Sequence, residues 1–231
     1  RRQISSSDLH NPLVPLRRVF SDRYLLSFAL LSITFMYPFY LGTTVSFYYL
    51  DEKFASFSNT DNGVVTAIMA VWAVILMLFA LPALLKRLNP ETIVFMGMLG
   101  MVLNGVAYCA VTAAWQVFAF IPVTEASAFV GMTVMSQMIS VAVSAEEQGE
   151  VNGTIAAIKE LATILGPICG SVLFSVGRYH MGEGKTFIEL PFISSVLVAA
   201  VGLGVILFML KPLLRSHRAM SGLEKSAGES Q

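Results

Sequence analysis

Charged residues are scarce in this chain. Asp, Glu, Lys and Arg make up 13% of its 231 residues, whereas a soluble domain carries about 25%. Hydrophobic residues make up 55%, which excludes an ordinary water-soluble globule and also excludes a disordered chain. Lys and Arg (15) balance Asp and Glu (15), so the chain lacks the basic excess that a nucleic-acid binder needs. We therefore expect a membrane protein without a nucleic-acid partner.

Residues that build cofactor, metal and disulfide sites are also few. The two cysteines, Cys109 and Cys169, lie within apolar runs and indicate no disulfide framework. The three histidines lie outside every long apolar run, so no histidine inside the membrane is available as a general base or a metal ligand: His10, His180 and His217. No Gly-rich phosphate loop is present. We expect no enzymatic activity, no cofactor and no metal site.

Long apolar runs are abundant. A helix needs about 20 mostly apolar residues to cross the hydrocarbon layer. Six such runs are present: Tyr24–Leu50, Val64–Leu85, Thr92–Ala114, Val117–Val143, Thr154–Val176 and Leu190–Leu210. In lipid, the backbone N–H and C=O groups must be hydrogen-bonded within helices or closed barrels. The alternating pattern of a membrane barrel is absent, so the runs are expected to form helices. The predicted fold class is an all-α membrane protein with six transmembrane helices.

Basic residues predict how these helices are oriented, because Lys and Arg mark the cytoplasmic side. With the N-terminus inside, most basic residues are cytoplasmic: Arg1, Arg2, Arg17, Arg18, Arg23, Lys86, Arg87, Lys211, Arg215, Arg218 and Lys225. Three face outward: Lys53, Arg178 and Lys185. We therefore expect a multi-pass protein with both termini in the cytoplasm.

The two ends of the chain are more polar than its centre. Residues 1–23 contain Pro12 and Pro15 and predict a flexible cytoplasmic linker, and residues 211–231 predict a cytoplasmic tail. The first residue is Arg1 rather than Met. The sequence is therefore expected to be a fragment of a longer protein.

The segment from Ser144 to Phe174, SAEEQGEVNGTIAAIKELATILGPICGSVLF, carries the most specific motif. It resembles the start of the eleventh helix of major facilitator superfamily transporters, and these residues match: Glu146, Glu147, Gln148, Gly149, Gly153, Leu165, Gly166 and Pro167. Within it, Gly149, Gly153 and Ala157 recur every four residues and predict a flat strip for close helix packing.

A second stretch resembles the same superfamily. LDEKFASFSNTDNGVVTAIMAVWAV, followed by LPALLKRLNPETIVFMG, is similar to its short external loop, eighth helix and basic inner turn, with Pro82, Leu85, Lys86 and Arg87 in the turn. The branch it most resembles contains tetracycline-resistance-type and hippocampus-abundant-transcript-type transporters. The resemblance implies the C-terminal six-helix half, built from two inverted three-helix repeats, with an N-terminal half as partner.

Glu125 is the strongest candidate for a functional residue. It lies about eight residues inside the fourth run, where a charge costs about 2.5–3.5 kcal/mol. It should face the bundle interior. Burial favours the neutral form of a carboxyl group, so Glu125 is interpreted as a proton-coupling or substrate-binding group. The alternative is a structural acid that is hydrogen-bonded to a neighbouring helix.

Lys159 and Glu160 lie within the fifth run and are the next candidates. They need not pair, because adjacent helical residues point about 100° apart. Lys159 lies in the inner half and Glu125 in the outer half, so no direct ion pair between them is expected. Lys159 can bind an anionic group or a carboxylate of the missing half, or serve as a snorkelling structural residue.

The remaining candidates are prolines, aromatic residues and amides. Pro38 predicts a kink beside Tyr37 and Tyr40, whose phenols either pack or face a cavity. Further hinge or packing candidates are Pro122, Gly166 and Pro167. Asn104 and Gln137 either line a cavity or join neighbouring helices.

Together these features predict a secondary active transporter of a small organic solute. The resemblance implies alternating access and proton antiport, so the expected partners are a small-molecule substrate, protons and the lipid bilayer. The alternative is a non-transporting membrane scaffold or receptor that retains the transporter fold.

Overall fold

A computed structural model describes residues 13–54, 57–144, 147–179 and 187–214, and every regular element in these ranges is helical. In chain order the elements are α1 (Leu13–Ser21), α2 (Arg23–Lys53), α3 (Asn59–Ile75), η2 (Leu76–Ala80), α4 (Leu81–Arg87), α5 (Pro90–Ala110), α6 (Ala114–Ala142), α7 (Gln148–Tyr179), α8 (Leu190–Val205) and η3 (Ile206–Leu210).

Six of the continuous helices in the described ranges are long and apolar enough to cross a membrane, as the sequence predicts. Segments α3, η2 and α4 form one of them, Asn59–Arg87, and α8 continues through η3 to Leu214. The ends differ from the expected runs. For example, the third helix ends at Ala110 rather than Ala114, and the fifth begins at Gln148 rather than Thr154.

Local side chains explain where several helices begin. Asp22 Oδ1 accepts a hydrogen bond from the backbone N–H of Tyr24 at 2.7 Å and starts α2. Ser58 and Asp61 form a capping box at the start of α3. Gln116 Oε1 accepts the backbone N–H of Thr112 at 2.8 Å just before α6. These caps satisfy N–H groups that no helix bond reaches.

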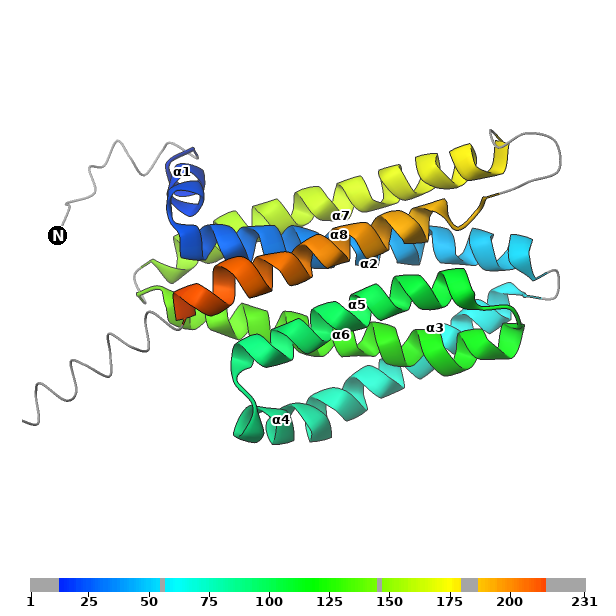
Figure 1. The fold of residues 1–231 in the computed structure, drawn as a ribbon, viewed down its shortest axis with the longest axis horizontal. Coiled ribbons are helices and arrows are strands. Elements are labelled where there is room, and N and C mark those ends of the chain that lie inside the picture. The colour runs from blue at the N-terminus through cyan, green and yellow to red at the C-terminus, as the bar shows by residue number, and fades with distance from the viewer. Residues whose placement is uncertain (1–12, 55–56, 145–146, 180–186, 215–231) are drawn as a thin grey trace, which may run out of the picture.

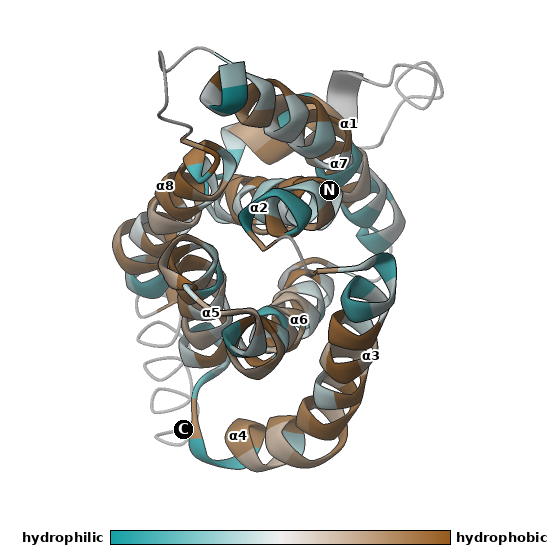
Figure 2. Cartoon of the chain, turned by 90° about the vertical axis from the view of Figure 1, so that its right-hand side faces the viewer, coloured by the Kyte–Doolittle hydropathy of each residue, from teal (hydrophilic) through white to brown (hydrophobic). Residues whose placement is uncertain are grey.

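The transmembrane helices pack in a curved row (Figure 1, Figure 2). Helix α3 packs on α6, α6 on α5, α5 on α8, α8 on α2, and α2 on α7. Seen end-on in Figure 2, α3 and α7 lie at the two ends of this row. We call the end of the bundle where α2, α5 and α7 begin the α1 end, and the other the far end.

The pairing of helices has an internal symmetry. If α2, α3 and α5 are exchanged for α6, α7 and α8, the packing of α2 on α7 becomes that of α6 on α3, and the packing of α5 on α6 becomes that of α8 on α2. Corresponding helices run in opposite directions, because α2 begins at the α1 end and α6 begins at the far end. This is the arrangement of two inverted three-helix repeats.

Two apolar clusters hold the bundle together. The cluster towards the α1 end contains the fully buried side chains of Phe28, Phe35 and Met98. The cluster towards the far end is built around aromatic residues and contains Tyr49 and Phe192. The two clusters divide the interior between them, and Glu125 belongs to neither.

Two membrane helices contain a π-helical turn near the α1 end. In η2 the N–H of Leu81 bonds to Leu76 five residues earlier, and in η3 the N–H of Lys211 bonds to Ile206 in the same way. A proline follows each turn, at positions 82 and 212. Proline has no N–H and clashes with the preceding turn, so a widened turn relieves the strain it would cause.

The ends of the chain differ in part from the expected linker and tail. A nine-residue helix, α1, covers Leu13–Ser21 within the expected linker, and helical structure continues from 211 to 214. An apolar face on α1, discussed below, favours this helix over an irregular chain. Residues 1–12 and 215–231 lie outside the described residues, as does Glu146 of the acidic turn.

Candidate functional site

Glu125 lies on the side of α6 that faces α2. It follows Pro122 by one turn and is half-buried. Residues four apart share a helix face, and Phe129, four residues later, packs its ring on Phe39 of α2 with centroids 5.4 Å apart. The carboxylate therefore lies on a face of α6 that also carries a contact with α2.

A phenol from α5 lies close enough to Glu125 to interact with it electrostatically. Tyr108 is buried, lies within electrostatic range of the Glu125 carboxylate and faces the hydroxyl of Ser46 on α2. The ring stacks on Phe192 of α8 with centroids 4.2 Å apart and planes 15° apart. Side chains from α2, α5 and α8 therefore meet at Tyr108, which lies near this acid.

Polar contacts continue from Tyr108 to the far end. The Tyr49 hydroxyl donates to the backbone carbonyl of Tyr108, and Lys53 Nζ donates to the Tyr49 hydroxyl. Lys53 also pairs with Glu189, at 3.1 Å, just before α8. We call this set the Glu125 network: Ser46, Tyr49, Lys53, Tyr108, Glu125 and Glu189. Its hydroxyls can donate hydrogen bonds, and its carboxyl group can hold or release a proton.

The sequence pattern indicates Glu125 but not the other members of the Glu125 network. Tyr49 and Lys53 are four residues apart in α2, a spacing that places them on one helix face. That spacing is the only sequence signal for the network. Contacts between different helices depend on packing, which the one-dimensional pattern does not give.

Lys159 and Glu160 lie in α7, away from this network. The Lys159 side chain is half-buried and the Glu160 side chain is exposed. The ion pairs found among the described residues join Arg18 to Glu147, Lys53 to Glu189, and Arg178 to Glu52. They include neither a Lys159–Glu125 pair nor a Lys159–Glu160 pair.

Tyr37, Pro38 and Tyr40 belong to the contact between α2 and α7. A Cβ atom added at Gly166 would lie 2.9 Å from the Tyr37 carbonyl and 3.2 Å from the Tyr40 Cβ. The Tyr37 phenol faces Ser194 and Cys169. Pro38 is buried inside the continuous helix α2. The backbone of this group therefore packs against α7, and the two roles considered for the phenols stay predictions.

Pro122 and Pro167 are likewise internal to helices, in α6 and α7, and neither helix ends at its proline. Gly149 and Gly153 differ from the expected packing strip. A Cβ atom added at either would meet nothing within 4 Å, so no described helix covers them. The close glycine contact of α7 lies at Gly166 and Gly170 instead, because that face is turned towards α2.

Asn104 and Gln137 have different surroundings. The buried Asn104 amide of α5 donates from Nδ2 to Thr124 Oγ1 of α6 at 3.1 Å, so it joins two helices. Gln137 is exposed and lines a cavity of about 320 Å³ at the α1 end, together with Tyr24, Leu85, Pro90, Glu91, Val134, Met138, Val141 and Leu214.

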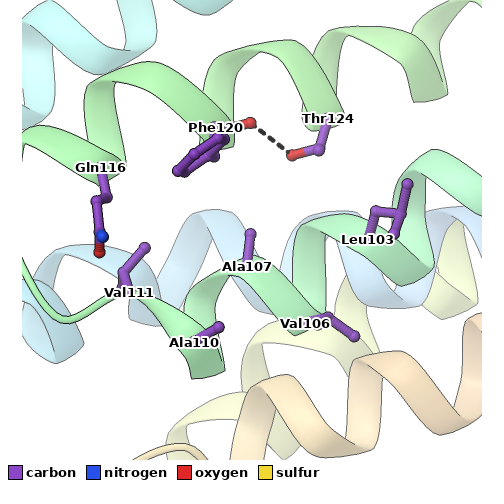
Figure 3. Close-up of a pocket in the computed structure, with 8 residues that line it drawn as sticks. All are labelled: Leu103, Val106, Ala107, Ala110, Val111, Gln116, Phe120 and Thr124. Atoms are coloured by element: carbon purple, nitrogen blue, oxygen red, sulfur yellow. Dashed lines mark hydrogen bonds between the residues drawn. The ribbon is translucent and has the colours of Figure 1, made fainter.

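A second cavity, of about 300 Å³, lies between α5 and α6 towards the far end (Figure 3). Its two polar side chains are already engaged: Gln116 caps α6, and Thr124 Oγ1 donates to the Phe120 carbonyl at 2.9 Å. The remaining lining is apolar: Leu103, Val106, Ala107, Ala110, Val111 and Phe120. This cavity is therefore an apolar groove, and neither cavity is lined by Glu125 or Lys159.

The described residues lack the ligand set of a metal centre. The described residues contain no group of three or more His, Cys, Asp or Glu side chains that could hold a metal ion. The chemistry of the site therefore rests on one carboxyl group, its neighbouring hydroxyls and the Lys53–Glu189 pair.

Comparisons with known proteins agree with this architecture. The sequence model of the Major Facilitator Superfamily matches residues 1–167. A protein named tetracycline resistance protein, class D, from Salmonella ordonez is 28% identical over 93 residues, which is 40% of this chain and 23% of that protein. The match therefore spans less than two thirds of the relative. With its six membrane-length helices and matched family region, the chain is a multi-pass membrane protein that belongs to the Major Facilitator Superfamily.

Proposed function

We propose that this chain is a six-helix bundle of a secondary transporter for a small organic solute, and that it works by alternating access against a second bundle. The family and the similarity to a tetracycline resistance protein support transport. The inverted repeats support a rocking mechanism, because related transporters move one bundle against another around a central site.

The main support for proton-coupled transport is the Glu125 carboxylate within a membrane helix. A carboxyl group inside a membrane helix is costly unless it has a function or a partner. None of the ion pairs among the described residues contains Glu125, and the Tyr108 phenol of α5 lies within electrostatic range of its carboxyl group. A proton or a cationic substrate group can therefore neutralise it, and exchange between the two couples transport to protons.

The open faces of α3 and α7 support a second bundle. Both end the curved row, and large apolar side chains are exposed on them: Trp72 on α3, Phe79 on the η2 turn that continues it, and Leu161 on α7. The exposed side of α7 also carries Glu160, twelve residues inside the helix, along with Gly149 and Gly153. A carboxylate facing lipid would be costly, so we propose that the N-terminal half covers this side.

The basic residues support a cytoplasmic α1 end. Near that end lie most of the basic residues that the structure describes: Arg17, Arg18, Arg23, Lys86, Arg87 and Lys211. Lys53 and Arg178 lie near the far end. By the positive-inside rule, this distribution supports a cytoplasmic location for both chain ends.

The decisive experiment measures tetracycline uptake by the complete transporter in inverted membrane vesicles with an imposed pH gradient. We expect the wild type to concentrate tetracycline, Glu125→Gln to lose pH-driven uptake, and Glu125→Asp to keep part of it. Asp51→Asn is the matched control, because Asp51 is exposed at the end of α2 and outside the network. Uptake by Glu125→Gln that still follows the pH gradient would contradict proton coupling. An absence of uptake of any organic solute by the wild type would favour a scaffold or receptor.

A further inference from the structure

Helix α1 does not follow the direction of the membrane helices. Figure 1 shows it lying across the bundle at the α1 end. One residue, Asp22, separates it from α2, and the side chain of Asp22 caps α2. A helix tied this closely to the start of a membrane helix must lie at the level where that helix enters the bilayer.

The apolar side of α1 is only partly covered by the bundle. Successive residues of a helix are about 100° apart, so Leu16, Val19 and Phe20 form one continuous apolar arc. Val19 is fully buried against the bundle, whereas Leu16 is 36% and Phe20 is 55% exposed. Half of this arc packs on protein, and the other half is open.

The charged side of α1 is divided in a similar way. Arg18 donates to Glu147 Oε1 at 2.7 Å and so ties α1 to the turn before α7. Arg17 and Arg23 are exposed. Lys86, Arg87 and Lys211 lie at the same end of the bundle, although α4 is on the opposite side from α1 (Figure 1). Basic side chains at this end complement an anionic surface.

We propose that α1 is an interfacial helix that docks on anionic lipid headgroups of the membrane that the bundle spans. Leu16 and Phe20 enter the boundary between headgroups and acyl chains, and Arg17 and Arg23 contact lipid phosphates. Arg18 holds the helix to the bundle. The pattern of a short helix with an apolar arc and flanking arginines suits a lipid interface, and the position of α1 beside the start of α2 places that interface within reach.

Fluorescence quenching tests the insertion of Phe20. The protein carries Phe20→Trp in a background of Trp72→Phe and Trp115→Phe, which leaves one tryptophan, and is reconstituted in vesicles whose phospholipids carry brominated acyl chains. Ser21→Trp in the same background is the matched control, because Ser21 is exposed on the polar side of α1. We expect strong quenching at position 20 and weak quenching at 21. Equal, solvent-like emission at both positions would overturn the proposal. Blue-shifted but unquenched emission at position 20 would also overturn it, because the side chain would then be buried in protein.

Lipid composition tests the electrostatic part. Phosphatidylglycerol added to phosphatidylcholine vesicles should increase quenching at position 20, and raised salt should reverse the increase. Arg17→Gln and Arg23→Gln should each lower the ratio of docked to undocked α1 about fivefold, the effect expected of one basic residue at an anionic surface. Quenching that responds to neither the anionic lipid nor these substitutions would overturn the role of the headgroups.

Discussion

At the scale of single residues, Asn104 illustrates how a polar side chain is used inside this bundle. Its Nδ2 donates to Thr124 Oγ1 across the α5–α6 contact, and Thr124 Oγ1 in turn donates to backbone carbonyls of its own helix. The sequence leaves two roles open, a cavity contact or a link between helices. The observed hydrogen bond joins α5 to α6 and so favours the role of a link between helices.

The Asn104–Thr124 hydrogen bond should contribute modestly to stability. We expect Asn104→Ala to lower the free energy of unfolding by about 1 kcal/mol, and a double-mutant cycle with Thr124→Val to give a coupling of about 0.6–1.7 kcal/mol, the range for hydrogen bonds between membrane helices. Denaturation in mixed micelles measures both values. Ser136→Ala is the control, because the Ser136 hydroxyl donates within its own helix. A coupling near zero would contradict the link.

The Arg18–Glu147 pair should make the docking of α1 depend on pH. The hydrogen bond from Arg18 lowers the pKa of the exposed Glu147 carboxyl and raises the pKa of Arg18. Because the folded pKa of Glu147 is lowered, the contribution of the pair is complete above the unfolded pKa of about 4.3 and is lost as the pH falls through the lower folded value. Hydrogen exchange of the α1 amides, corrected for intrinsic rates, should rise there. Glu147→Gln should remove this dependence, and a change centred between pH 5 and 7 would contradict it.

Part of the candidate site is predictable from sequence, and part is not. Glu125 is visible because a carboxylate in an apolar run is chemically conspicuous. Tyr49, Tyr108 and Ser46 are ordinary members of membrane helices. Their roles arise from contacts between α2 and α5, and hydropathy does not specify how these helices pack.

At the scale of helices, the glycines of α7 show the limit of motif spacing. Gly149 and Gly153 are four residues apart, as are Gly166 and Gly170. Both pairs permit close packing, yet only the second pair packs on α2 in this bundle. The spacing predicts that a smooth strip exists. Which helix covers it depends on the rotation of α7 about its axis.

Substitutions at these glycines should therefore have different effects. Gly166→Leu places a side chain against the backbone of Tyr37 and Leu41, and we expect it to lower stability by about 1–3 kcal/mol through overpacking. Gly153→Leu should leave the stability of this bundle within about 0.5 kcal/mol, as at an unfilled surface position. Unfolding in detergent measures both changes.

A transport assay tests whether Gly153 lies in the contact proposed for the second bundle. In the complete transporter, Gly153→Leu should reduce uptake, because the added side chain obstructs the contact proposed for the second bundle. Gly204→Leu is the control, because Gly204 of α8 also has open space around it but lies outside that contact. Equal uptake by Gly153→Leu and the wild type would contradict the placement of the second bundle on this side of α7.

Apolar length predicts the existence of the membrane helices well, because each must bury its backbone in hydrocarbon. The positions of their ends depend on capping residues such as Asp22 and Ser58. Hydropathy does not predict these capping hydrogen bonds. Helix α1 is missed because its apolar arc is short and two prolines precede or begin it. The π-helical turns are missed because their hydrogen bonds leave the apolar pattern unchanged.

At the scale of the whole molecule, the bundle places its two ends on opposite sides of a membrane. Labelling with a membrane-impermeant thiol reagent tests this topology. In a chain with Cys109→Ser and Cys169→Ser, a cysteine at Thr60 and one at Ser144 should label from opposite sides, because both positions are exposed and lie at the far end and the α1 end. Labelling of Ser144→Cys from the cytoplasmic side supports the proposed orientation. Labelling of both from one side would contradict the six-helix topology.

The widened turns of η2 and η3 each accommodate one residue more than a regular turn. Deleting Ala80 would therefore convert η2 into a regular α-helical turn, and α4 would keep nearly the same rotation about its axis. A deletion within the regular part of α3 would instead rotate the residues that follow it by about 100°, which would turn Leu85 out of the lining of the α1-end cavity and change the direction of Lys86 and Arg87. The π-helical turn is thus the position in this helix at which the loss of one residue is tolerated best.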